Sequence, residues 1–266
     1  GTGTWSLASG NYANRFASIV VGAITESAGR IATKLKTVAA DMLEVAVEDV
    51  ELTDGRARIV GVPDSGIGIG RVAAATHWHP AGLPAGMAPG LYETALLTPD
   101  VLDAPDSADR VASAVTFGFI CDLAAVEIDP QTGRVRIERY ASVHDVGRIL
   151  NPIIVEGQVR GGFAHGFGAA MFEELIYDDD GNFLSGTFAD YLCPTAADLP
   201  PLELAHSRTD SPQNSLGSKG MGDGSSMLTP VVMANAVSDA LDRDDIELPL
   251  TLDKVWRLAN DGKGQS

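Results

Sequence analysis

Five glycines within one predicted helix constrain this chain more than any other feature of its sequence. The helix is expected from about Ile154 to Leu175, and its stretch Glu156–Gly168 has glycine at positions 157, 161, 162, 166 and 168. In an exposed helix interior each glycine costs roughly 1 kcal/mol relative to alanine. Close packing against a second helix would justify one or two of them. Five glycines favour a helix that packs against a large neighbouring group. Gln158 can offer that group both a hydrogen-bond donor and an acceptor.

A second glycine-rich stretch, Gly217–Ser226, contains four glycines together with Lys219 and Asp223. Glycine lets a backbone approach a bulky ligand closely and adopt positive φ. A single acid displayed on such a loop is a candidate general base. A flexible surface turn has the same composition. This stretch alone therefore leaves a linker and a functional site equally open.

Composition limits the possible functions. The 266 residues are 45% hydrophobic, enough for one large globular domain or two smaller ones. A net charge of -17 excludes nucleic acid as a partner, since no basic stripe exists to neutralise phosphates. No run of 18 apolar residues predicts a membrane span. The two cysteines, Cys121 and Cys193, form no CxxC pair, which excludes a cysteine-based metal or iron–sulfur site in this chain and favours the cytoplasm.

The predicted elements mix helices and strands without strict alternation, which indicates an α+β fold with mixed sheets and long packed helices. The predicted helices run from after Ser9 to about Leu43 and over 154–175, 229–241 and 253–258. The predicted strands are a hairpin over 50–60 with Asp54-Gly55 at its turn, 123–128, 135–143, a hairpin-like pair over 176–188, and 202–206. The Pro/Gly-rich segment 73–111 is predicted to be a long irregular connection.

His77 and His79 form a weaker candidate site within that connection. On a strand, two histidines two residues apart would face the same way and bind a metal ion. No third ligand is evident in the sequence. A role in packing or on a loop surface is therefore the favoured interpretation.

Motifs spread over nearly the whole chain resemble one known family. They are Gly1–Ser9, Ala124–Gly133, Asp145–Pro152 followed by Glu156–Val159, Glu173–Leu175, Asp190-Tyr191, Leu199–Pro201, Gly217–Ser226 and Leu248–Thr251. Their order and spacing resemble the molybdenum-binding large subunit of the xanthine dehydrogenase, aldehyde oxidase and aerobic carbon monoxide dehydrogenase family of molybdenum hydroxylases.

The resemblance implies a place within a larger assembly. It corresponds to the C-terminal molybdopterin-binding region, with residues 1–120 as the end of a first subdomain, including the irregular connection, and 121–266 as a second subdomain. The chain begins at Gly1 without a methionine, inside what resembles a cofactor-binding loop. The N-terminal part of the large subunit is therefore expected as a separate chain or fragment. Iron–sulfur clusters and FAD are expected on partner subunits.

The resemblance also implies cofactor contacts for named residues. Thr4, Trp5, Ser6, Leu7, Ala8 and Ser9 match the loop that holds molybdopterin. Leu7 and Ala8 stand where serine and arginine are common, so contacts there would come from the backbone. Asp145, Arg148, Ile149, Leu150 and Asn151 match a turn that binds the dinucleotide end, expected to carry cytosine. Gln158 matches a glutamine that hydrogen-bonds the pterin, and Lys219 with Gly220 matches residues near the cofactor phosphates. The chain supplies no metal ligand, because the pterin dithiolene holds the molybdenum.

Asp223 occupies the position of the family's catalytic glutamate. The resemblance implies that this carboxylate accepts a proton from the water-derived oxygen that is transferred to an electron-poor carbon of a small-molecule substrate. Such a complex would oxidise an aldehyde or hydroxylate an aromatic N-heterocycle. Aspartate is one methylene shorter, and displacing a catalytic group by ~1 Å costs roughly 10²-fold in rate. A catalytically idle or specialised cofactor-binding half of such a complex is therefore the alternative.

Overall fold

A computed structural model describes residues 14–112 and 114–261 and confirms the predicted α+β class. The chain divides into two compact units, one formed by Ile19–Ala112 and the other by Gly1–Ser18 together with Ser113–Ser266. The division predicted after residue 120 stays a prediction about the subdomains of the whole protein. Within the described ranges, no helix is both long enough and apolar enough to cross a membrane.

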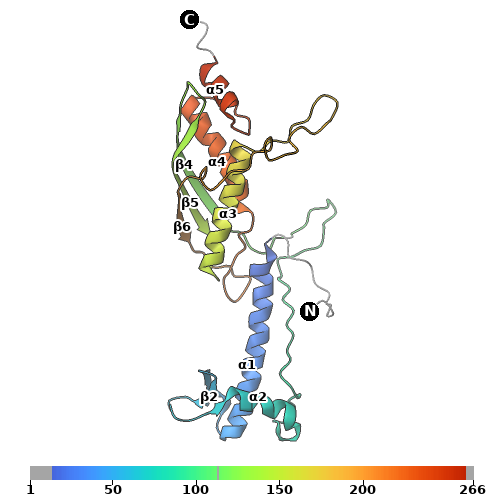
Figure 1. The fold of residues 1–266 in the computed structure, drawn as a ribbon. Helices are drawn as coiled ribbons and strands as arrows, with labels where there is room; N and C mark the ends of the chain where they lie inside the picture. The colour runs from blue at the N-terminus through green and yellow to red at the C-terminus, as the bar shows by residue number, and fades with distance from the viewer. Residues whose placement is uncertain (1–13, 113, 262–266) are drawn as a thin grey trace. The chain divides into compact units, whose positions relative to one another are not determined.

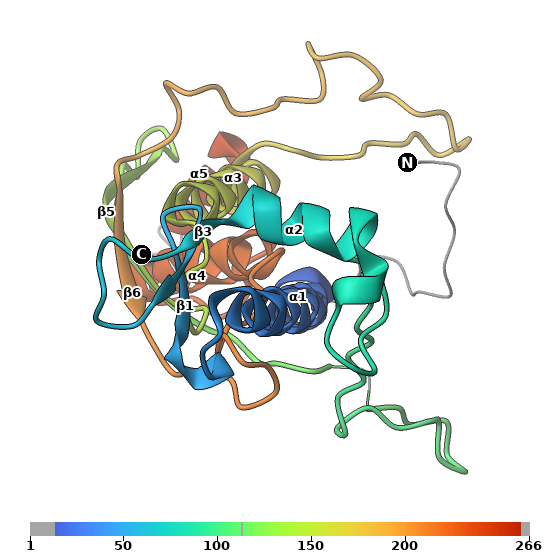
Figure 2. The same ribbon diagram turned by 90° about the horizontal axis from the view of Figure 1, so that it is seen from below.

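The unit Ile19–Ala112 combines helix α1 (Val21–Leu43) with a small antiparallel sheet and helix α2 (Ile69–Trp78) (Figures 1 and 2). The sheet contains β1 (Val50–Thr53), β2 (Arg56–Ile59) and β3 (Ile67–Gly68). The predicted hairpin is confirmed, with Asp54 and Gly55 both at positive φ in its turn. The buried core of this unit contains Leu35, Val38, Ala39, Ala40, Val50, Ala57 and Val72.

Helix α2 is a correction to the predicted irregular connection over 73–111. It buries Val72 and Thr76, one helical turn apart, and the next helical turn is stopped by Pro80. The neighbouring glycines and prolines hid this short amphipathic pattern. His77 lies in helix α2 and His79 follows the last residue of that helix. The two histidines are therefore not on a strand, and the strand-based metal site considered from the sequence is wrong. Among the described residues, no group of three or more His, Cys, Asp or Glu side chains could hold a metal ion.

The second unit is a three-stranded sheet covered on one face by helices. Strand β4 (Phe119–Ile128) pairs antiparallel with β5 (Val135–Asp145), and β5 pairs parallel with β6 (Leu202–Ser207). Alternate residues of β4 are exposed and half-buried along its whole length, as expected for a sheet with one covered face. Tyr177 and Phe183 form an isolated antiparallel bridge and Leu184 N donates to Ile176 O at 2.8 Å, so the predicted hairpin-like pairing over 176–188 is present but does not extend into regular strands.

Three helices complete this unit: α3 (Pro152–Met171), α4 (Gly224–Leu241) and α5 (Leu252–Asn260). Helices α3 and α4 lie side by side against the sheet (Figure 1). The buried core contains Tyr140, Phe163, Phe167, Ala170, Met233, Val237, Leu250 and Val255. Helix α4 begins five residues before the predicted start at 229, because its first turn packs on α3 despite its Gly/Ser composition.

The glycines of α3 divide into two groups. A Cβ at Gly166 would lie 2.8 Å from Thr229 Cβ, and one at Gly162 would lie 3.0 Å from Ser225 Cβ, so these two glycines permit the close approach of α4. Gly168 is similarly crowded by Glu173 and Pro194. A Cβ at positions 157 or 161 would meet no described atom within 4 Å. Contact with α4 therefore explains two of the five glycines and contact with the segments after α3 a third, which leaves a pair, one helical turn apart, facing open space.

Candidate functional site

The turn after β5 and the glycine-rich loop before α4 are joined by backbone hydrogen bonds. Gly147 and Ser218 form an isolated antiparallel bridge. Lys219 N donates to Val146 O at 2.9 Å, and Arg148 N donates to Gly217 O at 3.1 Å. Gly147 has φ +63, and a Cβ there would lie 2.1 Å from Gly217 O, so only glycine fits this approach. Two of the segments singled out from the sequence thus meet at one place.

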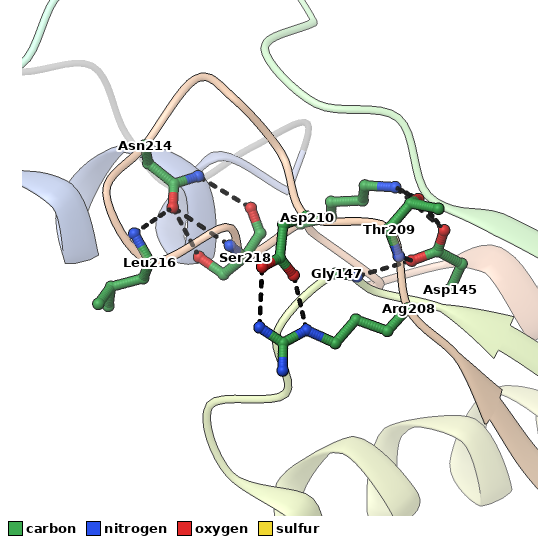
Figure 3. Close-up of polar contacts among 9 residues, drawn as sticks. Asp145, Gly147, Arg208, Thr209, Asp210, Asn214, Leu216 and Ser218 are labelled. Carbon is green, nitrogen blue, oxygen red and sulfur yellow. Dashed lines mark hydrogen bonds and ion pairs between the residues drawn. The ribbon is translucent and has the colours of Figure 1, made fainter.

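Asp145, Thr209 and Lys219 form a hydrogen-bonded cluster, named here the Asp145 cluster, in which Asp145 and Lys219 are buried and Thr209 is exposed. Figure 3 shows Asp145 beside Thr209. Lys219 Nζ lies 3.2 Å from Asp145 Oδ2 and donates to Thr209 Oγ1 at 2.6 Å. Asp145 Oδ1 accepts from the backbone N–H of Gly147 at 2.9 Å and of Thr209 at 3.1 Å, and the Thr209 hydroxyl donates to Oδ2. Every oxygen of this carboxylate is therefore partnered.

The electrostatics of the Asp145 cluster favour a charged pair. Burial acts to raise the pKa of Asp145, but the hydrogen bonds from Thr209, the Gly147 N–H and Lys219 together hold that pKa well below its usual range. The ammonium of Lys219 also lies 5.7 Å from the centre of the Phe119 ring. Its charge is thus already matched within the protein by Asp145.

The loop is anchored on its other side by Gly222. Gln158 of α3 donates through Nε2 to Gly222 O at 2.5 Å, and Gly222 N donates to Asn14 Oδ1 at 2.8 Å. Asp223 follows directly and lies at the residue before α4. Its carbonyl accepts from Met227 N and Ser226 Oγ, while its carboxylate makes no capping hydrogen bond and is exposed. The site therefore positions the backbone of Asp223 firmly and leaves its side chain accessible.

The remaining predicted cofactor residues lie along the same turn. Arg148, Leu150 and Asn151 are exposed, and Ile149 is half-buried. Asn151 caps α3 by accepting a hydrogen bond from Ile154 N at 3.2 Å. Gly220 lines the pocket described next. The loop Thr4–Ser9 lies outside the described residues.

A pocket of about 400 Å³ opens beside the joined segments. Its described lining residues are Asn14, Gly118, Phe119, Ile120, His144, Asp145, Val146, Gly220, Met221, Gly224, Met227 and Leu228. None of these is a lysine or an arginine. The volume lies within the range of small-molecule sites, and the lining is mostly apolar, as such sites usually are.

One lining residue, His144, was not found by the sequence reasoning. It is fully buried on the covered face of β5, and its Nε2 lies 2.7 Å from Ser142 Oγ. Its other ring nitrogen, Nδ1, is buried without a hydrogen-bond partner among the described residues. The predicted strand ended at residue 143, whereas β5 continues to Asp145, so the two-residue spacing that puts Ser142 and His144 on one face of the sheet was missed.

Comparison with known proteins decides the family. Residues 2–200 match the model of a molybdopterin cofactor-binding domain. The chain belongs to this molybdopterin-binding family. It is 40% identical over 252 residues to the large subunit of nicotine 6-hydroxylase from Paenarthrobacter nicotinovorans, and 31% identical over 252 residues to the carbon monoxide dehydrogenase large chain from Afipia carboxidovorans. Each match covers 94% of this chain and 29% of the relative.

Solved structures agree with this molybdopterin-binding assignment. A Cu,Mo-CO dehydrogenase matches with a TM-score of 0.82 and 30% identity, over 97% of this chain and 31% of that chain. Quinoline 2-oxidoreductase from Pseudomonas putida 86 matches with a TM-score of 0.80 and 34% identity, over 95% of this chain and 31% of that chain. The resemblance predicted from the motifs is confirmed, and the chain spans just under a third of the length of these relatives.

Proposed function

We propose that this chain acts within the large subunit of a multisubunit molybdenum hydroxylase, where it forms one side of the molybdopterin site. The observation that carries the proposal is the meeting of three predicted cofactor segments of a family member. The turn after Asp145 and the loop around Gly220 join beside the pocket, and Gln158 donates to Gly222 of that loop. The residues present fit such a cofactor, because the pocket has a buried unpartnered nitrogen and α3 has two open glycines. When bound, the molybdenum cofactor supplies the two-electron redox chemistry.

The proposed reaction is hydroxylation of an aromatic N-heterocycle, with water as the oxygen source. Two relatives are named for nicotine and quinoline, both of which contain such rings. Oxidation of an aldehyde is the second candidate reaction, since an aldehyde oxidoreductase subunit from Escherichia coli also matches part of the chain. In either reaction we assign Asp223 the role of general base. Gln158 and Asn14 would position it by holding the preceding peptide.

The wider assembly follows from the same proposal. The rest of the large subunit, an iron–sulfur subunit and an FAD subunit are the proposed partners, because two cysteines are too few to hold an iron–sulfur cluster within this chain. The proposed cofactor form is the cytosine dinucleotide, with its nucleotide end on the exposed turn that includes Arg148 and Asn151. Release of CMP on acid hydrolysis of the purified complex tests that form. The cytoplasm is the proposed compartment, since both cysteines are free and exposed.

The alternative is a specialised cofactor-binding half in which Asp223 has no catalytic role. Aspartate in place of the family's glutamate, on an exposed position, is the observation that favours it. Turnover of nicotine, quinoline and an aromatic aldehyde by the complete complex separates the two. We expect Asp223→Ala to lower kcat by roughly 10²- to 10⁴-fold, and Asp223→Glu to retain activity. Asp239→Ala, which removes an exposed acid further along α4, is the control.

The molybdenum and pterin content of each preparation is measured together with its turnover. Full turnover by Asp223→Ala with unchanged cofactor content rejects the catalytic role and favours the specialised half. A complex that contains no molybdopterin rejects the proposed function itself.

A further inference from the structure

A chain of hydrogen-bonded polar groups runs across β4 and β5 to the pocket, with Tyr140, Ser142 and His144 buried and Asp122 half-buried. Asp122 of β4 lies opposite Ser142 of β5, and His144 follows two residues later on the same face. Ser142 Oγ donates to Asp122 Oδ1 and lies 2.7 Å from His144 Nε2. Tyr140 donates its hydroxyl proton to Asp122 Oδ2 at 2.8 Å. Asp122, Tyr140, Ser142 and His144 are named here the His144 chain.

The position of each proton in the His144 chain follows from its acceptors. A carboxylate only accepts hydrogen bonds, and a serine hydroxyl has a single proton to donate. Because Ser142 gives its proton to Asp122, its oxygen must accept from His144. The Nε2 atom of His144 therefore carries a hydrogen. In the neutral imidazole the other nitrogen, Nδ1, is then a lone-pair acceptor.

The surroundings keep the imidazole neutral. Burial lowers the pKa of His144; the charge of Asp122 opposes that shift, and the ring of His206, centred 6.5 Å away, reinforces it. A buried acceptor without a partner is costly, and native proteins rarely leave one in that state. Nδ1 has no partner among the described residues, and His144 lines the pocket. The missing donor is therefore expected to come from the occupant of that pocket.

The other lining residues indicate which occupant suits the pocket. Phe119, Met221 and Met227 provide apolar and aromatic surface, which suits a flat ring. The only charged residue in the described lining is Asp145, whose charge Lys219 balances, so this lining offers an anion no net positive charge. Gly224, the first residue of α4, also lines the pocket, and a helix N-terminus attracts phosphate. A phosphate group is therefore the competing occupant.

We infer that this pocket takes an uncharged nitrogen heterocycle whose N–H or NH₂ group donates a hydrogen bond to His144 Nδ1. The inference rests on the proposed function, in which the heterocycle belongs to the cofactor. Both a pterin ring and a cytosine ring carry such donors. The pocket is therefore expected to recognise the N–H or NH₂ donor that the two rings share. His144 is then a binding residue whose acceptor character is set by Ser142 and Asp122, two groups that do not reach the ligand.

Equilibrium dialysis of the complete protein, prepared without cofactor, tests this inference with three probes: 6-hydroxymethylpterin, cytidine and inorganic pyrophosphate. We expect one of the two heterocycles to bind, and which one binds identifies the end of the cofactor that lies here. His144→Phe should weaken that binding by about 3- to 10-fold, the effect of one hydrogen bond. His144→Asn, whose amide oxygen replaces Nδ1 as an acceptor, should retain most of the affinity.

Ser142→Ala sharpens the test because it keeps the imidazole ring. An imidazole that accepts at Nδ1 carries its hydrogen on Nε2, and without the serine oxygen that buried N–H has no described acceptor, so binding should weaken. Val143→Ala, on the exposed face of β5 between Ser142 and His144, is the control, with unchanged affinity expected. If His144→Phe does not fold, the Ser142→Ala result decides alone.

Three outcomes would overturn the inference: neither heterocycle binds, pyrophosphate binds in their place, or the affinity of Ser142→Ala and His144→Phe equals that of the unaltered protein. The molybdenum and pterin content of the cofactor-loaded complex separates this failure from failure of the proposed function. A loaded complex that contains molybdopterin while these variants bind the probes normally rejects the role of His144 alone.

Discussion

The last residues of β5 contribute to two polar clusters that differ in how completely the hydrogen bonds of their buried groups are satisfied. In the Asp145 cluster, the carboxylate has a partner at both oxygens and its charge is matched by Lys219. In the His144 chain, the series of hydrogen bonds stops at Nδ1, which has no described partner. The Asp145 cluster is therefore suited to hold two segments of the chain together. The His144 chain is suited to bind a ligand that donates a hydrogen bond.

The comparison changes the meaning of residues that resemble cofactor contacts. Asp145 and Lys219 were both predicted to face the cofactor, yet in this structure they bind each other across 74 positions of sequence. A fully paired ammonium has little charge left for a phosphate. His144, which no motif marked, instead presents the free hydrogen-bonding atom. An adjacent pair of residues thus divides into one that stabilises the site and one that is available to a ligand.

Breaking the Asp145 cluster should have the largest effect. Lys219→Met leaves a buried carboxylate without its counter-charge, which typically costs about 3–5 kcal/mol of the free energy of unfolding. Arg208→Met, which breaks the adjacent exposed pair with Asp210, should cost less than about 1 kcal/mol. Urea unfolding of the two variants measures the difference. Equal losses would show that the buried pair contributes no more than a surface one.

Helix α3 also has one glycine in crowded surroundings and another in open surroundings. Substituting them should change the free energy of unfolding less than breaking the Asp145 cluster does. Gly166→Ala places a methyl group 2.8 Å from Thr229 Cβ, so overpacking should cost about 1–3 kcal/mol. Gly161→Ala meets no described atom, so the better helix propensity of alanine should stabilise the cofactor-free protein by up to about 1 kcal/mol. Thermal unfolding of both variants tests the pair. A stabilising Gly166→Ala would contradict the close packing of α3 and α4.

The sequence predicted much of this fold because its strongest signals are local. Alternation along 123–128 and 135–143 and the Asp54-Gly55 turn each depend on neighbouring residues only, and all three predictions are confirmed. Helix α2 and the first turn of α4 were missed for one reason. Glycine and serine disfavour helix locally, whereas burial of Val72 and contact with α3 at Gly162 favour it through distant residues.

The candidate site was predictable only in part for the same reason. Motif spacing selected Asp145, Gln158, Lys219 and Asp223, and the structure brings their segments together. The partners of those side chains depend on which residues lie opposite one another in space. The pairing of Asp122 with Ser142 is set by the register of β4 on β5, which includes a shift between Ala125 and Val126. No local pattern reveals that register, so the His144 chain became visible only in three dimensions.

The smallest expected effect distinguishes the two clusters by pH. A histidine whose pKa is lowered in the folded state takes up a proton less readily than it does unfolded. The contribution of His144 to the free energy of unfolding should therefore be complete above the ordinary pKa of 6.5. It should be lost as the pH drops from 6.5 through the folded pKa of His144. Asp145, whose pKa is lowered from 3.8, should cause a loss only at pH values below 3.8. Its contribution between pH 7 and about pH 5 is therefore flat.

His144→Phe isolates the histidine contribution to that pH dependence. The free energy of unfolding of the unaltered protein minus that of the variant should fall from pH 7 to pH 5, because the variant has no imidazole to protonate. Every other residue is common to the two proteins, so its contribution cancels in the comparison to a first approximation. Parallel curves for the two proteins would mean that the imidazole is protonated equally easily when folded and unfolded. The acceptor at Nδ1 would then disappear at the ordinary histidine pKa, and the distinction between the satisfied cluster and the unsatisfied chain would lose its electrostatic basis.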